Sequence, residues 1–156
     1  INSLKLSNLT IASPDMGGSK RAYAYSKFLS SDVVICYKQR EKANIISHIE
    51  LIGNVEGKNV ILVDDMVDTA GTLTKAADLM KDRGAISVRA VCTHALLSGK
   101  AYEKIEESQL EELIVTDSIP SKVSHPKVKV LSCAPLFAEV MKNVHSNQSI
   151  SSKFVM

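Results

Sequence analysis

The sequence contains no tryptophan and few aromatic residues of any kind. Four Tyr and three Phe are spread over 156 residues, so the core must be built from Ile, Leu, Val, Ala and Met. Long apolar runs are missing too, since the longest unbroken one is Val33–Tyr37. A membrane-spanning helix needs about 20 apolar residues, so we expect no membrane partner.

An excess of charge of one sign is also missing. The 19 Lys and Arg residues oppose 17 Asp and Glu residues, which leaves a formal net charge of +2 and no long basic block. Surfaces that bind nucleic acid are usually strongly basic, so the sequence argues against a nucleic-acid partner. A composition of 45% hydrophobic and 23% charged residues is typical of one ordinary globular domain.

Cysteine is scarce, and the three cysteines lie far apart in apolar stretches, at Cys36, Cys92 and Cys133. An odd number of widely separated cysteines indicates neither a disulfide framework nor a zinc site. We expect three ordinary buried thiols in a reducing compartment, where such residues stay reduced.

What the sequence does contain is an alternation of short β-rich runs and helical stretches. The pattern predicts strands at residues 9–12, 32–37, 50–53, 59–63, 87–93, 112–116 and 127–131. It predicts helices at residues 19–29, 72–83, 99–107 (with Ser98 as N-cap) and 134–145, and an irregular polar segment at 38–49. Strands separated by helices favour an α/β fold of three layers, with a mostly parallel sheet flanked by helices.

Ligands of such sheets bind at the carboxyl ends of the strands. Four unusual segments follow predicted strands at those ends, namely residues 13–18, 38–42, 64–72 and 93–99. We therefore expect these four segments to converge in space and to form the functional site.

Residues 64–72 (DDMVDTAGT) carry the clearest functional pattern. Asp64 and Asp65 are acceptors suited to paired sugar hydroxyls, and Gly71 permits backbone angles that a side chain would forbid. The free N–H groups of the following helix start favour a phosphate. The pattern thus predicts a pentose phosphate site, and the alternative is a plain turn with Thr69 or Thr72 as helix cap.

Asp68 does not fit a phosphate site by charge, so we expect its side chain to hold the loop by bonding nearby backbone N–H groups. In the first segment, Asp15 is followed by Gly17 and Gly18, which let backbone amides approach a diphosphate while a carboxylate holds Mg²⁺. The alternative for that segment is a simple turn and helix start.

Other charged groups carry weaker signals. Lys38 and Arg40 can meet a polyphosphate from one side, and the alternative is a solvated loop. His94 follows a buried strand on the ligand side, where a structural role is the alternative. The remaining polar groups are expected at the solvated surface, namely His48, His125, His145 and the helix residues Lys20, Arg21 and Lys27.

Taken together, these segments resemble the ribose-phosphate diphosphokinase (PRPP synthetase) family, whose domain has a type I phosphoribosyltransferase-like fold. The resemblance rests on Ser13–Ala22 (SPDMGGSKRA), Lys38–Arg40 (KQR), residues 55–58 with 64–72, and the motifs at 93–94, 98–99, 116–120 and 149–154. Gln39 stands where the family usually has Arg, and Glu41 stands where Pro is common.

The resemblance implies roles for individual residues. Lys38 and Arg40 are catalytic, and Arg40 also contacts ribose 5-phosphate. Asp15 is a metal ligand in a diphosphate loop with Gly17 and Gly18. The ribose 5-phosphate site further includes Asp64, Asp65, Asp68, Thr69, Ala70, Gly71 and Thr72.

The implied reaction transfers the diphosphoryl group of ATP to the anomeric hydroxyl of ribose 5-phosphate and gives PRPP and AMP. The resemblance implies Mg²⁺ as the cofactor and the cytoplasm as the location. It also implies that phosphate or sulfate is a further ligand. The family forms homo-oligomers (hexamers of dimers).

The motifs match only the C-terminal half of the family. Residues 1–156 are therefore expected to form the C-terminal domain of a PRPP synthetase. The chain is expected to be a fragment that lacks the N-terminal domain and part of the ATP site, and to be inactive alone. The alternatives are a phosphoribosyltransferase that consumes PRPP, a non-catalytic regulatory homologue, and a simple sugar-phosphate binding module.

Overall fold

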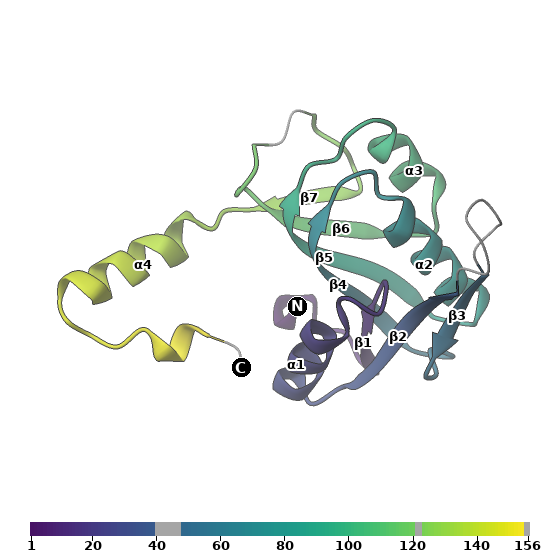
Figure 1. Cartoon of the computed structure of the whole chain (residues 1–156), viewed down its shortest axis with the longest axis horizontal. Coiled ribbons are helices and arrows are strands. Elements are labelled where there is room, and N and C mark those ends of the chain that lie inside the picture. The colour runs from purple at the N-terminus through teal and green to yellow at the C-terminus, as the bar shows by residue number, and fades with distance from the viewer. Residues whose placement is uncertain (40–47, 121–122, 155–156) are drawn as a thin grey trace.

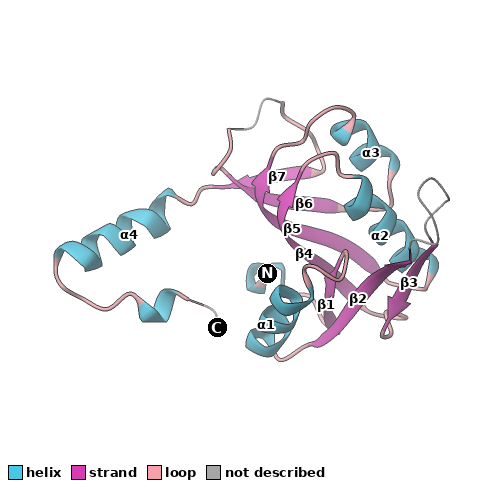
Figure 2. Cartoon of the chain, viewed as in Figure 1, coloured by secondary structure: helices cyan, strands magenta, loops and turns pink. Residues whose placement is uncertain are grey.

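A computed structural model of the chain describes residues 1–39, 48–120 and 123–154. The strands of this part form one sheet in the order β3-β2-β1-β4-β5-β6-β7 (Figures 1 and 2). They are β1 (Leu9–Ser13), β2 (Asp32–Gln39), β3 (His48–Ile52), β4 (Asn59–Val67), β5 (Ser87–Ala95), β6 (Glu112–Thr116) and β7 (Val128–Leu131). The helices are α1 (Ser19–Leu29), α2 (Gly71–Asp82), α3 (Ala101–Glu107) and α4 (Ala134–His145), with short 3-10 turns at Asn2–Leu4 and Ser151–Lys153.

The sheet is mostly parallel, as the sequence predicts. β3 pairs with β2 in the antiparallel direction, and the other neighbouring strands run parallel. α2 and α3 lie on one face of the sheet and α1 lies on the other (Figure 1). The three-layer α/β fold is therefore confirmed.

Strand β4 lies in the middle of the sheet, between β1 and β5. Val60 and Leu62 pack into the core on the side of α2, while Ile61 and Val63 pack on the side of α1. Burial of both faces explains why this strand is an unbroken apolar run rather than an alternating one.

The chain changes direction across the sheet between β1 and β4. After β1 it continues to β2 on one side, and after β4 it continues to β5 on the other. Such a topological switch point opens a crevice at the carboxyl ends of the two strands, because the connections leave in opposite directions. The segments that follow β1 and β4 therefore border the same crevice.

Several element boundaries differ from those predicted. β4 continues to Val67, because Met66 and Val67 still pair with His94 and Ala95 of β5. The expected irregular segment at residues 38–49 is wrong at both ends, since β2 reaches Gln39 and pairs with β3.

The third helix also starts later than predicted. α3 begins at Ala101 with Lys100 as N-cap and no side-chain cap. The prediction that Ser98 caps this helix is wrong, because the Ser98 hydroxyl bonds the carboxylate of Asp68 instead.

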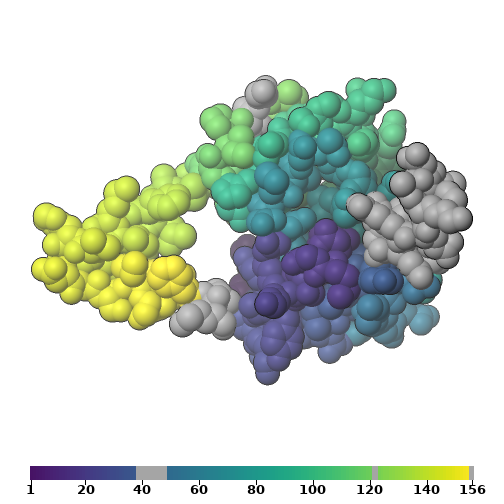
Figure 3. Space-filling model, in the orientation of Figure 1, coloured from purple at the N-terminus to yellow at the C-terminus, as the bar shows by residue number. Residues whose placement is uncertain are grey.

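Helix α4 stands apart from the sheet, and none of its residues is buried (Figure 3). Cys133 precedes it and is half-exposed, so the prediction of three buried thiols is wrong for this residue, whereas Cys36 and Cys92 are buried. His125 is also not a surface residue, because its side chain is only 12% exposed, with its ring 5.6 Å from that of Tyr102 and its Nε2 3.3 Å from Glu106 Oε2. No helix of the described residues is long and apolar enough to cross a bilayer.

The central position of β4 predicts where a core mutation is most costly. Ile61 is 0% exposed, whereas Ile86, in the turn before β5, is 58% exposed. We expect Ile61→Ala to lower the free energy of unfolding by about 2–5 kcal/mol, because it removes buried methylenes and leaves a cavity. Ile86→Ala is the matched control and should change it by less than about 0.5 kcal/mol in urea unfolding. Equal effects of the two substitutions would contradict the assignment of β4 as the core strand.

Candidate functional site

The crevice at the switch point is a hollow of about 300 Å³. It is lined by Asp15 from the segment after β1 and by residues 64–73, which run from the end of β4 into the first turn of α2. Two of the four predicted site segments therefore meet in one cavity. The segment after β5 joins them through its main chain, because Ser98 N donates to Asp68 O at 3.0 Å.

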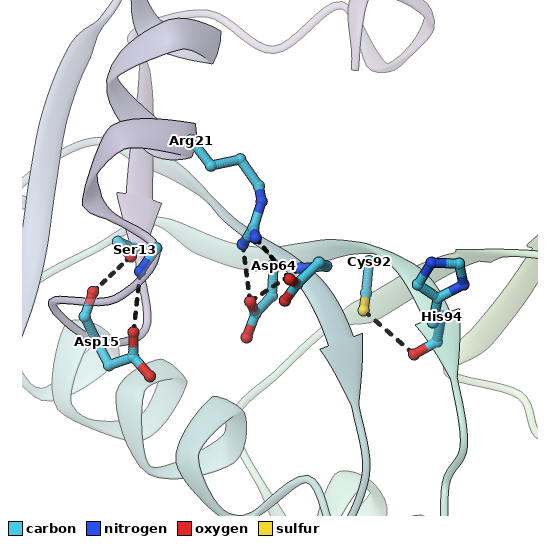
Figure 4. A network of polar contacts seen from close by, with 8 residues as sticks. Ser13, Asp15, Arg21, Asp64, Cys92 and His94 are labelled. Carbon is cyan, nitrogen blue, oxygen red and sulfur yellow. Dashed lines mark hydrogen bonds and ion pairs between the residues drawn. The ribbon is translucent and has the colours of Figure 1, made fainter.

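Two adjacent carboxylates at the end of β4 share one guanidinium. Arg21 Nη1 contacts Asp64 Oδ1 at 2.9 Å, and Arg21 Nη2 contacts Asp65 Oδ2 at 2.8 Å (Figure 4). Arg21 lies in the first turn of α1, the helix that follows β1, so the two contacts join α1 to β4. The fork of the guanidinium matches two acceptors at once, so it fixes the direction in which both carboxylates point.

The two carboxylates differ in their affinity for protons. Partial burial is the main reason that the pKa of Asp64 is raised, with the adjacent Asp65 adding to it. The hydrogen bond with Asp64 is the main reason that the pKa of Asp65 is lowered, and Arg21 lowers both. On acidification the pair therefore takes up its first proton at Asp64.

Arg21 is the residue that the sequence analysis missed. We expected it at a solvated surface with Lys20 and Lys27, and the two contacts to Asp64 and Asp65 show that this was wrong. The available signal was its position in the first turn of the helix that follows β1. A parallel sheet places the start of that helix at the same edge as the end of β4. Three carboxylates within residues 64–68 also require a cation nearby.

The segment after β1 is a tight turn organised around Asp15. Ser13 Oγ donates to Asp15 O at 2.6 Å, and Gly18 N donates to Asp15 Oδ1 at 3.1 Å (Figure 4). A Cβ at Gly18 would lie 2.5 Å from Ser13 Oγ, and one at Gly17 would lie 3.2 Å from Asp15 Oδ1. A side chain at Gly18 would therefore displace the Ser13 hydroxyl that holds the turn, whereas one at Gly17 would need only a small shift of the Asp15 carboxylate.

The loop between β4 and α2 leaves the start of the helix uncapped. Ala70 is the N-cap residue, with φ at 59°, and no side chain caps α2. The alternative in which Thr69 or Thr72 caps the helix is therefore wrong. Thr69 and Thr72 are exposed, while Ala70 is buried, so the small residues turn the chain and leave the hydroxyls accessible.

Asp68 is held differently from what the sequence predicts. Its carboxylate accepts a hydrogen bond from the Ser98 hydroxyl, and within the described part of the chain no backbone N–H group near it does the same. This bond joins the loop after β4 to the segment after β5, 30 residues further along the chain. Sequence spacing alone gives no signal for it.

The neighbouring strands carry polar groups of a different kind. His94 is exposed, and its Nδ1 lies 2.9 Å from Ser118 Oγ, which itself donates to Thr93 O. Burial raises the pKa of the Cys92 thiol to about 12 and that of Cys36 to about 11. Neither thiol is ionised at neutral pH, so neither is a nucleophile at this site.

The predicted catalytic residues are not part of this geometry. The main chain of Lys38 pairs with Ile49 near the end of β2. The side chains of Lys38 and Gln39 and all of residues 40–42 lie outside the described residues. Their convergence with the crevice stays a prediction.

The donors present suit a magnesium ion that is held mainly by its substrate. Among the described residues, no group of three or more His, Cys, Asp or Glu side chains could hold a metal. Asp15 offers the hollow an exposed carboxylate from the β1 side, opposite Asp64, Asp65 and Asp68, and its Oδ1 is oriented by Gly18 N. Mg²⁺ commonly takes one or two carboxylates and completes its shell with phosphate oxygens and water, so Asp15 fits such a site.

Removal of the guanidinium should show directly in the titration of the carboxylates. We expect Arg21→Met to raise the pKa of both Asp64 and Asp65, because the cation that favours their ionised forms is lost. Carboxyl ¹³C shifts followed against pH measure this. Lys20→Met, which removes the neighbouring exposed cation of α1, should leave both titrations almost unchanged. Unaltered pKa values in Arg21→Met would rule out the paired contact in solution.

Comparison with known proteins assigns this architecture to one family. The model of the phosphoribosyl synthetase-associated domain matches residues 13–155. A ribose-phosphate pyrophosphokinase of Campylobacter jejuni is 54% identical over 148 residues, which are 95% of this chain and 48% of that protein. The chain thus spans about half the length of the curated relatives that it matches.

Solved structures agree with this assignment. The phosphoribosylpyrophosphate synthetase of Mycobacterium smegmatis is similar with a TM-score of 0.80 and 33% identity, over 90% of this chain and 46% of that one. The purine phosphoribosyltransferase of Pyrococcus horikoshii, at 17% identity over 85% of this chain and 78% of that one, has a TM-score of 0.53 and shares the fold. The crevice between β1 and β4 is thus set in a type I phosphoribosyltransferase-like fold, and the chain belongs to the phosphoribosyl synthetase family.

Proposed function

We propose that this chain carries the ribose 5-phosphate and diphosphate side of a ribose-phosphate diphosphokinase site. The observation that carries the proposal is the single hollow that joins Asp15, the Asp64–Asp65 pair and the uncapped start of α2. It offers a metal ligand, two hydroxyl acceptors and a phosphate-binding helix end in sequence order. The pyrophosphokinase name of a relative that is 54% identical supports the same reaction.

Each part of the hollow has a distinct task in this proposal. Asp64 and Asp65 accept hydrogen bonds from the ribose hydroxyls, and Arg21 keeps both carboxylates ionised and correctly aimed. The phosphate binds over Asp68–Thr72, where the N–H groups at the start of α2 and the helix dipole favour an anion. The sugar is then fixed at both ends, so its anomeric hydroxyl has one orientation.

The proposed reaction is a displacement at the β-phosphorus of ATP. The anomeric oxygen forms a bond to that phosphorus, the bond from the β-phosphorus to the α,β-bridging oxygen breaks, and AMP leaves. The anomeric hydroxyl loses its proton to solvent. Mg²⁺, when bound at Asp15, neutralises charge on the diphosphate, while Lys38 and Arg40 are proposed to cover the transferring group.

A phosphoribosyltransferase would use the same fold and a similar loop. The purine phosphoribosyltransferase of Pyrococcus horikoshii is only 17% identical to this chain, so the likeness between them is limited to the fold. The resemblance of Lys38–Arg40 and of the last residues to the diphosphokinases favours the synthesis of PRPP over its consumption.

The phosphate loop can be tested with a single hydroxyl. We expect Thr72→Val to weaken the binding of ribose 5-phosphate by roughly 1.5–3 kcal/mol in calorimetric titration, because a hydrogen bond to a charged group is lost. Ser7→Ala removes an exposed hydroxyl before β1, at the opposite end of the sheet, and should leave the affinity unchanged. Full affinity in Thr72→Val would exclude this hydroxyl from the site.

The proposal that this chain carries only one side of the site predicts a second result. We expect the isolated chain to release no measurable AMP from ATP, Mg²⁺, phosphate and ribose 5-phosphate, although it binds the sugar phosphate. The reason is that the chain spans about half the length of the curated relatives that it matches, and its described residues contain no group of three or more His, Cys, Asp or Glu side chains that could hold a metal by themselves. Turnover at ordinary enzymatic rates of about 1–10³ per second would contradict this division.

A further inference from the structure

The loop that follows β4 is held in place by the segment that follows β5. Leu96 N and Leu97 N both donate to Val67 O, at 2.9 and 3.2 Å, and Ser98 N donates to Asp68 O at 3.0 Å. The Ser98 hydroxyl also bonds the Asp68 carboxylate. The conformation of the loop therefore depends on its neighbour in the sheet as well as on its own small residues.

Helix α3 extends the same contact with a cation. Lys104 Nζ donates to Thr69 O at 3.0 Å. The same nitrogen lies 3.6 Å from the position that a Cβ of Gly71 would occupy, so it is beside the first residue of α2. A lysine ammonium has three N–H donors, and the bond to Thr69 O uses one of them. The others are available to a ligand at the helix start.

The negative charges around the loop favour a cation at this position. Asp64, Asp65 and Asp68 all border the hollow, and a sugar phosphate adds about −1.5 to −2. Arg21 is already engaged by Asp64 and Asp65, and the partner of Asp68 is an uncharged hydroxyl. The helix dipole contributes only about half a positive charge. Lys75 of α2 is exposed and borders a separate hollow with Thr69 and Thr72, so a phosphate over the loop still has room for a further counter-charge.

We infer that the ammonium group of Lys104 binds the phosphate of the sugar phosphate directly, while its bond to Thr69 O positions it beside the helix start. The inference deepens the proposed function and rests on it, because it concerns the same phosphate site. It adds a specificity-determining residue from α3 to a loop whose other contacts are backbone groups and hydroxyls.

A purely structural role for Lys104 makes a different prediction. If the residue only braced Thr69 O, its positive charge would not matter to the ligand beyond the shape of the loop. If it binds phosphate, affinity depends on charge at this position. The two roles are separated by substitutions that keep or remove the charge and by the dependence of binding on salt.

The experiment is a calorimetric titration of the chain with ribose 5-phosphate and, separately, with inorganic phosphate. Lys104→Met and Lys104→Gln should weaken both ligands about ten- to a hundredfold and make binding less sensitive to salt, because one charge-assisted contact is lost. Lys104→Arg should stay within about threefold of the parent chain. Lys100→Met is the matched control, since Lys100 is an exposed lysine at the start of the same helix, and it should have little effect.

The outcomes distinguish this inference from the proposed function. Unchanged affinity in Lys104→Met and Lys104→Gln would overturn the inference and leave the proposed site intact. An equal loss in Lys104→Arg, Lys104→Met and Lys104→Gln, with unaltered salt dependence, would reduce Lys104 to a structural brace and also overturn it. Failure of the parent chain to bind either ligand would instead contradict the proposed function itself. Matching thermal midpoints identify the variants that are folded.

Discussion

The site depends on one constraint, which is that a strand buried on both faces cannot carry charge until it leaves the core. β4 is apolar from Val60 to Val63 and becomes acidic at Asp64, where partial exposure begins. Ionised carboxylates are tolerated there only because solvent and Arg21 reach them. The end of the buried run therefore fixes the position of both carboxylates, and the loop and α2 follow from it.

Much of this arrangement was predictable from local sequence. The apolar run of β4 and the helical stretch of α1 are strong local patterns, and the bounds of α1, β6 and α4 match the prediction. A parallel sheet brings the carboxyl ends of its strands to one edge, so the meeting of Asp15 with Asp64 required no knowledge of side-chain contacts. Topology, rather than residue identity, made the site predictable.

The remaining features depend on contacts between residues far apart in sequence. Arg21 and Asp64 are 43 residues apart, and Ser98 and Asp68 are 30 apart. The first pair joins α1 to β4, the second joins the loop after β4 to the segment after β5, and no local pattern specifies which side chains meet. His125 was misjudged for the same reason, because Tyr102 and Glu106, which shelter it, belong to α3.

Helix α4 gives the chain two levels of stability. Its large apolar side chains Leu136, Phe137, Met141 and Val144 are each about half exposed or more, and none of its residues is buried. A helix of this length that buries none of its residues is marginal in water, because nucleation is costly and few hydrogen bonds offset it. Its amide protons should therefore exchange with solvent by fraying of the helix alone, while those of β4 await opening of the sheet. Circular dichroism would then record two superimposed transitions, and a two-state fit would underestimate the cooperativity of the sheet.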